Sequence, residues 1–377
     1  MFMANVKDES FLNLNCSSEQ LKRYPKFFGN ISSFLSEDFG TIKKWPLILE
    51  TALARMTGFR GAVAVQSFAD TVKLGLELTG IKPGMEIVVP ETAPTSVLKG
   101  IKKLGAIPLF ARCKKNLSID TEDLADLLTS DTSAIFNFSY CGVPNNSTLL
   151  QKFAKSFNLR LIEGANFLPL PGLNFSPTMV NTDALVLSLS PLSVVHGLTD
   201  FGVLLLNDKK AIFDITTGLR INTHDNYIPD YTASFNRLDG ANAAAACSLL
   251  EHSERITKRR IRNANYYQKL LQGTQLLWSF EKGQLDFNSA DYFIVNAPQR
   301  DSLAQHLKCR KINSLRWTQV SLNVEPPELE NFEYNNNSEA KTKLELEALA
   351  LPCHDHLGRE QLDLIIDSLK GWLLSNG

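Results

Sequence analysis

The sequence lacks most of the features that mark secreted, membrane-spanning or metal-binding proteins. Its six cysteines are scattered and include no CxxC pair, so neither a disulfide framework nor a zinc-finger site is expected. No run reaches the roughly 18 consecutive apolar residues that a membrane span needs. The N-terminal stretch MFMANVKDES carries a charge at its seventh residue and does not have the pattern of a secretory signal. We therefore expect a cytoplasmic protein.

An excess of charge of either sign is also missing. The chain has 39 basic and 40 acidic residues among 377, and its net charge is -1. This balance gives no electrostatic reason to expect nucleic acid or an anionic membrane as a partner. The hydrophobic content of 44% is that of an ordinary globular protein, and the length allows more than one domain.

Short apolar runs alternate with helical patterns in the first part of the chain. Because most of these runs are almost continuously apolar, they predict strands that are covered on both faces, as in a mainly parallel sheet between helices. The last two runs are joined by a short loop, which allows them to be antiparallel neighbours. The expected strands are 62–67, 86–90, 108–113, 133–139, 160–165, 184–189 and 202–208. The expected helices between them are 70–80, 95–105, 121–130 and 147–158.

The pattern changes after residue 240. Residues 240–273 contain no proline and are rich in Ala, Leu, Arg and Lys, which predicts one long helix. A strand is expected at 291–298, an exposed loop at 330–340 and a closing amphipathic helix at 358–374. The expected divisions are an N-terminal segment at 1–30, a large domain at 31–245 and a small C-terminal α/β domain at 246–377.

Four segments, in the same order, resemble motifs of the DegT-type aminotransferases, which act on nucleotide-linked keto sugars. They are GIKPGMEIVVPETAPTSVLKGIKKLGAIPLFARC, YCGVPNNSTLLQKFAKSFNLRLIEGAN, FNRLDGANAAAA and LALPCHDHLGREQLDLIIDSL. The resemblance implies the type I fold of pyridoxal-phosphate (PLP) enzymes, with a mostly parallel seven-stranded sheet and a small C-terminal domain. Because sites of this fold are built across a dimer interface, it also implies a homodimer.

The catalytic loop of that family contains the lysine that forms a Schiff base with PLP. Here the corresponding stretch, LSLSPLSVVHGLTDFGVLLLND, contains no lysine. Aligned without a gap, the lysine position is Ser193. A serine hydroxyl has no nitrogen with which to form an imine, and it is a poor base near neutral pH.

Other cofactor anchors of the family are replaced as well. The aspartate that pairs with the pyridine nitrogen falls on Gly164. The remaining replaced positions are Phe68 and Ala69 in the phosphate cradle, Pro94 at the stacking aromatic, Phe167 at a glutamine and Phe235 at an asparagine. We therefore expect no PLP cofactor, and no catalytic residue is assigned.

The candidate ligand-binding residues are Ser188, Glu163, Ser67, Asn166 and His196. Ser188 aligns with a family serine near the cofactor phosphate, although a strand-end serine is often satisfied by the backbone. Glu163 ends a predicted parallel strand, where open α/β sheets bind ligands. His196 follows Ser193 closely, but no glycine-flanked elbow or placed acid indicates a nucleophile with its base.

Three further groups have simpler structural explanations. His354 and His356 flank Asp355 with the spacing of two metal ligands, but the family has histidines there too, and we expect no metal site. The basic run Lys258–Asn263 is expected to be a solvated face, with contact to a diphosphate or a partner as the alternative. The lysines in the predicted helices are not expected to replace the missing one; they are Lys73, Lys99, Lys102 and Lys103.

These observations lead to three functional hypotheses. The first is a catalytically degenerate sugar-aminotransferase-like protein in amino-sugar or polysaccharide biosynthesis. It would bind a sugar nucleotide or act as the partner of an active aminotransferase paralogue. The second is a PLP-independent enzyme acting on a nucleotide sugar in a refitted cleft. The third is a conventional PLP-dependent nucleotide-sugar aminotransferase.

Overall fold

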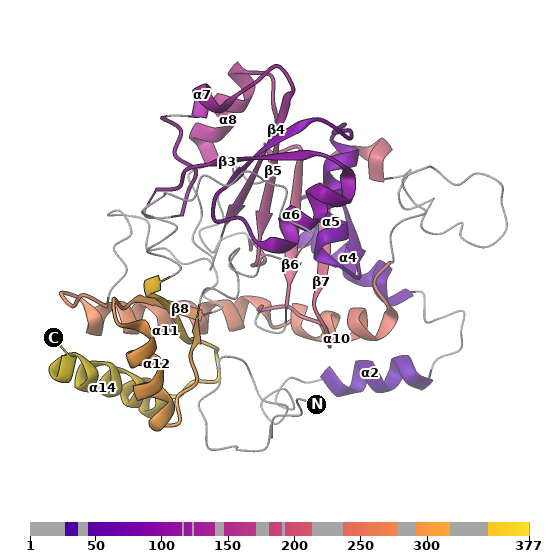
Figure 1. Ribbon diagram of the computed structural model, residues 1–377. Coiled ribbons are helices and arrows are strands. Elements are labelled where there is room, and N and C mark those ends of the chain that lie inside the picture. Colours follow the sequence, from indigo (N-terminus) through magenta and orange to yellow (C-terminus); the bar gives the residue numbers. More distant parts are fainter. Residues whose placement is uncertain are drawn as a thin grey trace, which may run out of the picture.

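The computed structural model has a large upper domain and a small lower-left domain (Figure 1). It describes residues 27–36, 44–114, 117–122, 124–139, 147–170, 181–190, 193–212, 237–276, 292–316 and 346–376. Among the described helices, none combines the length and apolar character that a membrane crossing requires.

The large domain is built on a seven-stranded sheet of order β1-β7-β6-β5-β4-β2-β3. Most of its strands are parallel, but β7 is antiparallel to both β1 and β6. Except in the edge strand β3, nearly every strand residue is buried, because helices cover both faces of the sheet, and this confirms the expectation from the apolar runs. The strands are β1 Gly61–Val65, β2 Glu86–Pro90, β3 Ile107–Ala111, β4 Thr132–Ser139, β5 Arg160–Ala165, β6 Ala184–Leu189 and β7 Phe201–Leu206.

The helices around this sheet enclose separate apolar clusters. Helices α5 (Phe68–Leu78) and α6 (Thr95–Leu104) contribute to the cluster on one face. On the other, α4 (Lys44–Thr57) packs against α10 (Gly240–Leu250). Helix α2 (Phe27–Ser36) also packs on α10. A further cluster involves the short α7 (Leu124–Leu127) and α8 (Ser147–Ser156).

The small domain has an antiparallel sheet of order β8-β10-β9. Its helices, α11, α12 and α14, surround an apolar core that includes the fully buried Tyr267 and Trp372. The strands are β8 Tyr292–Asn296, β9 Leu315–Arg316 and β10 Ala348–Pro352. The helices are α11 Ser253–Leu271, α12 Arg300–Cys309 and α14 Arg359–Asn376.

The structure differs from the sequence-based expectation in two elements. The long helix expected at 240–273 is divided into α10 and α11 by a turn at Glu251–His252. At this turn the Ser253 hydroxyl donates to the Leu250 carbonyl oxygen, a local bond that competes with the helical pattern. The helix expected at 121–130 is reduced to the four residues of α7. The loop expected at 330–340 lies outside the described residues.

Candidate functional site

Ser193 lies at the carboxyl edge of the large sheet, in the loop between β6 and β7, and its side chain is engaged with the protein backbone. Its hydroxyl lies 3.3 Å from the carbonyl oxygen of Asn166, to which it donates. The Oγ atom of Ser193 also accepts from the amide of Ser190 at 3.2 Å. Since Asn166 follows β5 directly, these bonds bring Ser193 close to Gly164 at the end of that strand. Ser193 is only 1% exposed, so its hydroxyl belongs to the packing of the loop.

Gly164 is closely covered by aromatic rings. It lies opposite Phe138 in the register of β4 and β5. A Cβ atom built on Gly164 would lie 2.6 Å from Cδ2 of Phe138 and 2.8 Å from Cε1 of Phe136. No real Cβ atom approaches other atoms so closely, so any side chain at position 164 requires these rings to move.

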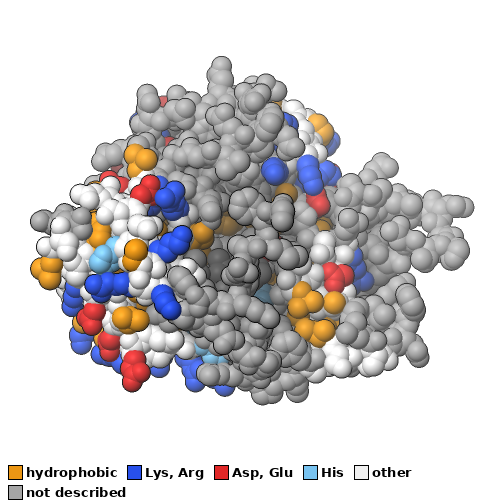
Figure 2. Space-filling view, turned by 60° about the horizontal axis from the view of Figure 1, so that its bottom comes forward, with side chains coloured by type: hydrophobic (Ala, Val, Ile, Leu, Met, Phe, Trp, Pro, Cys, Tyr) orange, Lys and Arg blue, Asp and Glu red, His pale blue; other side chains and the backbone are white. Residues whose placement is uncertain are grey.

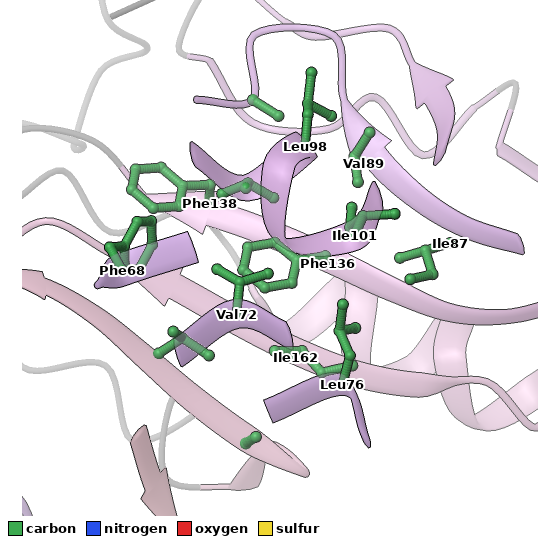
Figure 3. Packing of buried hydrophobic residues seen from close by; sticks show 14 of the residues in the cluster. Phe68, Val72, Leu76, Ile87, Val89, Leu98, Ile101, Phe136, Phe138 and Ile162 are labelled. Carbon is green, nitrogen blue, oxygen red and sulfur yellow. The ribbon is translucent and has the colours of Figure 1, made fainter. Parts of the chain in front are cut away.

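Phe68 extends the same aromatic group from the start of α5. Its ring lies 6.1 Å from that of Phe138 in an edge-to-face arrangement, a favourable geometry for an aromatic pair. Figure 3 shows Phe68, Phe136 and Phe138 side by side among the apolar side chains of α5, α6 and β2. Phe68 is 8% exposed. The sequence indicated Phe68 as a changed cofactor anchor but gave no sign of its contact with Phe138.

The first turn of α5 is capped by a candidate ligand residue. The Ser67 hydroxyl accepts from the amide of Asp70 at 3.4 Å, and Ser67 is the N-cap of the helix. The Ser67 carbonyl oxygen accepts from both the amide and the hydroxyl of Thr71. These bonds give polar groups at the start of the helix hydrogen-bond partners within the chain. Ala69, in this turn, is buried.

Ser188 and Glu163 lie on neighbouring strands of the sheet. Ser188 is half-buried on β6, opposite Gly202 of β7. Glu163 is completely buried, and its carboxylate accepts from the Asn137 side chain at 2.8 Å. Successive residues of a strand point to opposite faces, so Glu163 and Gly164 face different sides of β5. The structure therefore does not bring the Glu163 carboxylate and position 164 to one face.

His196 lies three residues beyond Ser193 and is 9% exposed. Its Nδ1 atom is 2.8 Å from the carbonyl oxygen of Gly197. Burial lowers the pKa of His196 and the positive charge of Arg260 adds to this effect, whereas the Gly197 carbonyl and Asp355 oppose it. The imidazole is therefore neutral at physiological pH, and its pKa is influenced by two charged residues of the small domain, Arg260 and Asp355.

The two C-terminal histidines lie near this junction. The rings of His354 and His356 are 6.5 Å apart, and Nε2 of His356 is 3.5 Å from Oδ2 of Asp355. The carbonyl oxygen of His354 accepts from the buried side chain of Asn263 on α11. Within the described parts of the chain, no three His, Cys, Asp or Glu side chains gather as a metal site would need. The expectation of no metal stays a prediction.

The remaining positions indicated by the sequence are spread over the large domain. Phe167 is completely buried, and Pro94 is the residue before α6, without a side-chain cap. Lys73 forms an ion pair with Glu77, and Lys103 forms one with Asp70. Phe235 lies outside the described residues.

Sequence reasoning missed Asn242, which holds the loop after His196. Its Oδ1 atom accepts from the amides of Leu198 and Thr199 at 2.7 and 2.9 Å, and its Nδ2 atom donates to the Thr199 hydroxyl. Asp239 caps α10 by accepting from the Asn242 amide. The segment FNRLDGANAAAA carried the signal, because Asn242 occupies the glutamine position of the motif that it resembles.

Arg237, in the same segment, forms an ion pair with Glu50 on α4. Its guanidinium is 3.0 Å from the carboxylate of Glu50, which is 4% exposed and also accepts from the amide of Ala64 on β1. A buried carboxylate is stable only when it is paired and hydrogen-bonded in this way. The retained motif thus fixes α4, β1 and α10 around the loop that contains Ser193.

These residues do not fit PLP held as a Schiff base on this chain. Ser193 provides no amine, and Gly164 provides no carboxylate for a pyridine nitrogen. The contacts of Phe136 and Phe138 with Gly164 leave no space for a side chain at that position without rearrangement. These residues therefore support no chemical step through PLP on this chain.

Solved structures share this fold, and two of the three described next contain a ketimine intermediate or a bound pyridoxamine cofactor. An aminotransferase from Brucella abortus is 20% identical, with a TM-score of 0.82 and coverage of 96% of this chain and 99% of that one. DesV from S. venezuelae, in complex with a ketimine intermediate, is 21% identical, with a TM-score of 0.80 and coverage of 96% and 97%. NtdA from Bacillus subtilis, with bound pyridoxamine phosphate (PMP), is 16% identical, with a TM-score of 0.78 and coverage of 96% and 85%. The expected fold is confirmed.

The expectation that the protein takes no cofactor is wrong in the light of these structures. The ketimine complex and the PMP-bound enzyme, together with a match to an aminotransferase family, indicate PLP as the relevant cofactor. The sequence-based expectation rested on individual anchor positions.

Curated relatives extend the same similarity along the chain. EryC1 of Saccharopolyspora erythraea, an erythromycin biosynthesis sensory transduction protein, is 23% identical over 82% of this chain and 84% of its own. A dTDP-3-amino-3,4,6-trideoxy-α-D-glucose transaminase of Streptomyces venezuelae is 22% identical over 82% of both chains. The model of the DegT/DnrJ/EryC1/StrS aminotransferase family matches residues 37–370. Since this match spans most of the chain and the fold agrees with it, the protein belongs to the DegT/DnrJ/EryC1/StrS aminotransferase family.

Proposed function

We propose that this chain is a non-catalytic subunit of a PLP-dependent sugar aminotransferase that acts in amino-sugar or polysaccharide biosynthesis. In this proposal a lysine-bearing paralogue holds PLP, and the present chain completes the dimer around the shared site. The observation that carries the proposal is the position of Ser193. Its hydroxyl is bonded to the backbone of residues 166 and 190, and it has no nitrogen that could form an imine.

The framework around Ser193 supports a role in assembly. Arg237 and Glu50 join α4 to β1, and Asn242 fixes the amides of Leu198 and Thr199. These contacts shape the loop between β6 and β7 without using the Ser193 hydroxyl. A subunit that completes the site of its neighbour needs such a framework, but it does not need an amine of its own.

A second candidate is a conventional nucleotide-sugar aminotransferase. It is favoured by the family match across residues 37–370 and by the similarity to the Streptomyces venezuelae transaminase over 82% of both chains. This function would require an amine from another residue, because Ser193 cannot supply one. Lys73 and Lys103 lie on helices α5 and α6 and are held in ion pairs with Glu77 and Asp70.

Co-expression with a lysine-bearing family paralogue from the same source would test the proposal. We expect native mass spectrometry to detect a heterodimer, and amino-sugar product to form from a nucleotide-linked keto sugar, PLP and glutamate. Replacing the lysine of the paralogue by alanine should abolish product formation. The matched change Ser193→Ala should leave the rate within about twofold, because this hydroxyl only orders the loop.

Two results would contradict the proposal. Failure to form any heterodimer, with product formed by the present chain alone, would favour the second candidate. A loss of roughly tenfold or more in the rate of the heterodimer with Ser193→Ala, about 1.4 kcal/mol in activation free energy, would give Ser193 a direct part in the chemistry.

A further inference from the structure

A cationic groove lies on the small domain, between α11 and α14. Its volume is about 430 Å³, and it is lined by residues that include Arg262, Tyr266, Lys269, Arg359 and Leu362. This volume is in the range of small-molecule sites, which is roughly 300–1,000 Å³. The small domain lies on the left of Figure 2, where Lys and Arg side chains lie among Asp and Glu side chains and uncharged and hydrophobic surface. The lining contains three cations and no carboxylate.

One of the three cations is fixed in position by its neighbours. The guanidinium carbon of Arg359 lies 3.8 Å from the centre of the Tyr266 ring, and its Nε atom is 3.3 Å from Oδ2 of Asp363. The Tyr266 hydroxyl donates to the other oxygen of Asp363. Arg359 is thus held over the ring as a flat group, the form in which arginine binds phosphate with two parallel hydrogen bonds.

The other two cations are not held by a ring and a carboxylate in this way, although Nη2 of Arg262 donates to Oδ1 of Asn263 at 3.3 Å. Within the described residues, no carboxylate lies at ion-pair distance from Arg262 or Lys269, whereas Lys258 on the same helix pairs with Glu254 at 2.5 Å. Arg262, Tyr266 and Lys269 follow one face of α11, with a rise of about 10 Å between the first and the last. Both long side chains can therefore reach an anion placed between them.

We infer that this groove is a binding site for a diphosphate group. Two negatively charged phosphates would match Arg262 and Lys269 along α11, with Arg359 providing the third set of donors from α14. The chain as a whole has a net charge of -1, so the attraction is local to the groove. The ligand is either a nucleoside diphosphate or free pyrophosphate, which share this chemistry. The site is separate from Ser193 and does not depend on the function proposed above.

Isothermal titration of the full chain with UDP and with pyrophosphate at low salt would test this inference. We expect at least one of them to bind, with a dissociation constant below about 1 mM. In the double variant Arg262→Gln/Lys269→Gln the affinity should fall by roughly 100-fold, because two charge-assisted contacts are lost. The matched control is Lys258→Gln, which removes a charge from α11 outside the groove and should change the affinity by less than about twofold.

The two ligands distinguish the sources of the diphosphate. Tighter binding of UDP that is lost in the double variant indicates a nucleotide, and equal binding indicates that the diphosphate alone is recognised. The inference is overturned if neither ligand binds, or if the double variant binds both as tightly as the wild type. Thermal unfolding would show that the double variant is folded, and both replaced side chains are exposed.

Discussion

Phe138 and Gly164 lie opposite each other on the parallel strands β4 and β5, and the Phe138 ring occupies the space that a side chain at position 164 would need. The distance from its Cδ2 atom to a Cβ atom built on Gly164 is 2.6 Å. In the alignment with the family motif, an aspartate corresponds to this position. Gly164, Phe136 and Phe138 therefore pack against one another. A side chain at position 164 could be accommodated only if the two rings moved.

The variant Gly164→Ala should lower the free energy of unfolding by about 1–3 kcal/mol, the usual cost of overpacking. Adding Phe138→Val should relieve part of this overpacking, since valine has no δ carbon and the atom nearest to the new methyl group is removed. Gly29→Ala on α2 is the matched control, because a Cβ atom there would have no neighbour within 4 Å. Urea denaturation of the four proteins measures these differences. Equal stability of Gly164→Ala and the wild type would contradict the close packing described here.

The variant Asn242→Ala should release the loop that follows His196. The amides of Leu198 and Thr199 lose their acceptor, at a cost of about 1–2 kcal/mol because water can replace it in part. Hydrogen exchange of these two amides should become faster by roughly tenfold. Thr199→Ala is the control: it removes the hydroxyl bonded to Asn242 but leaves both amides bound. Unchanged exchange in Asn242→Ala would mean that other contacts hold the loop.

His196 should make the stability depend on pH. Burial lowers the pKa of its folded form below the ordinary value of 6.5, so the unfolded chain takes up the proton first as the pH falls. Stability is therefore fully present above about pH 6.5 and is lost as the pH decreases toward the folded pKa.

The variant His196→Gln should lose less stability than the wild type between about pH 7.5 and about pH 5.5. Chemical denaturation at the two pH values measures the difference, and His306→Gln on α12 reports the general effect of replacing an imidazole. An identical loss of stability in His196→Gln and the wild type would show that protonation of this buried histidine is not linked to unfolding.

The sequence was sufficient to predict the strands of the large domain, because both faces of such strands are covered and their residues are almost all apolar. The run Arg160–Ala165 was predicted with the same bounds that β5 has in the structure. The contact between Phe138 and Gly164 could not be predicted, because it depends on which strands are neighbours and on their register. Composition alone determines neither the order of the strands nor their register.

The small domain was predicted less completely. Strand β10, Ala348–Pro352, is the middle strand of its sheet, but no strand was predicted at these residues. The groove between α11 and α14 also escaped prediction. The basic run Lys258–Asn263 was expected to be one solvated face, whereas Arg260 and Asn263 are buried and only part of the run is exposed. Which residues of a helix are buried depends on the elements that pack against it.

The variant Ser193→Lys should not produce a working aminotransferase on its own. A new amine at this position would still lack a carboxylate at Gly164. Phe136 and Phe138 fill the space beside that glycine, and Phe68 packs against Phe138. We expect no amino-sugar product above background with PLP and glutamate. The measurement is a chromatographic assay with nucleotide-linked 3-keto and 4-keto sugars. A rate near that of ordinary family members would mean that the serine is an isolated change in an otherwise intact site.

The most direct test of the central claim compares three preparations in that same assay: this chain alone, its lysine-bearing paralogue alone, and the two co-expressed. We expect no product from this chain alone and a rate for the co-expressed pair at least about tenfold above that of the paralogue alone, a difference of about 1.4 kcal/mol in activation free energy. Steady product formation by this chain alone, with PLP and glutamate and without any paralogue, would contradict it.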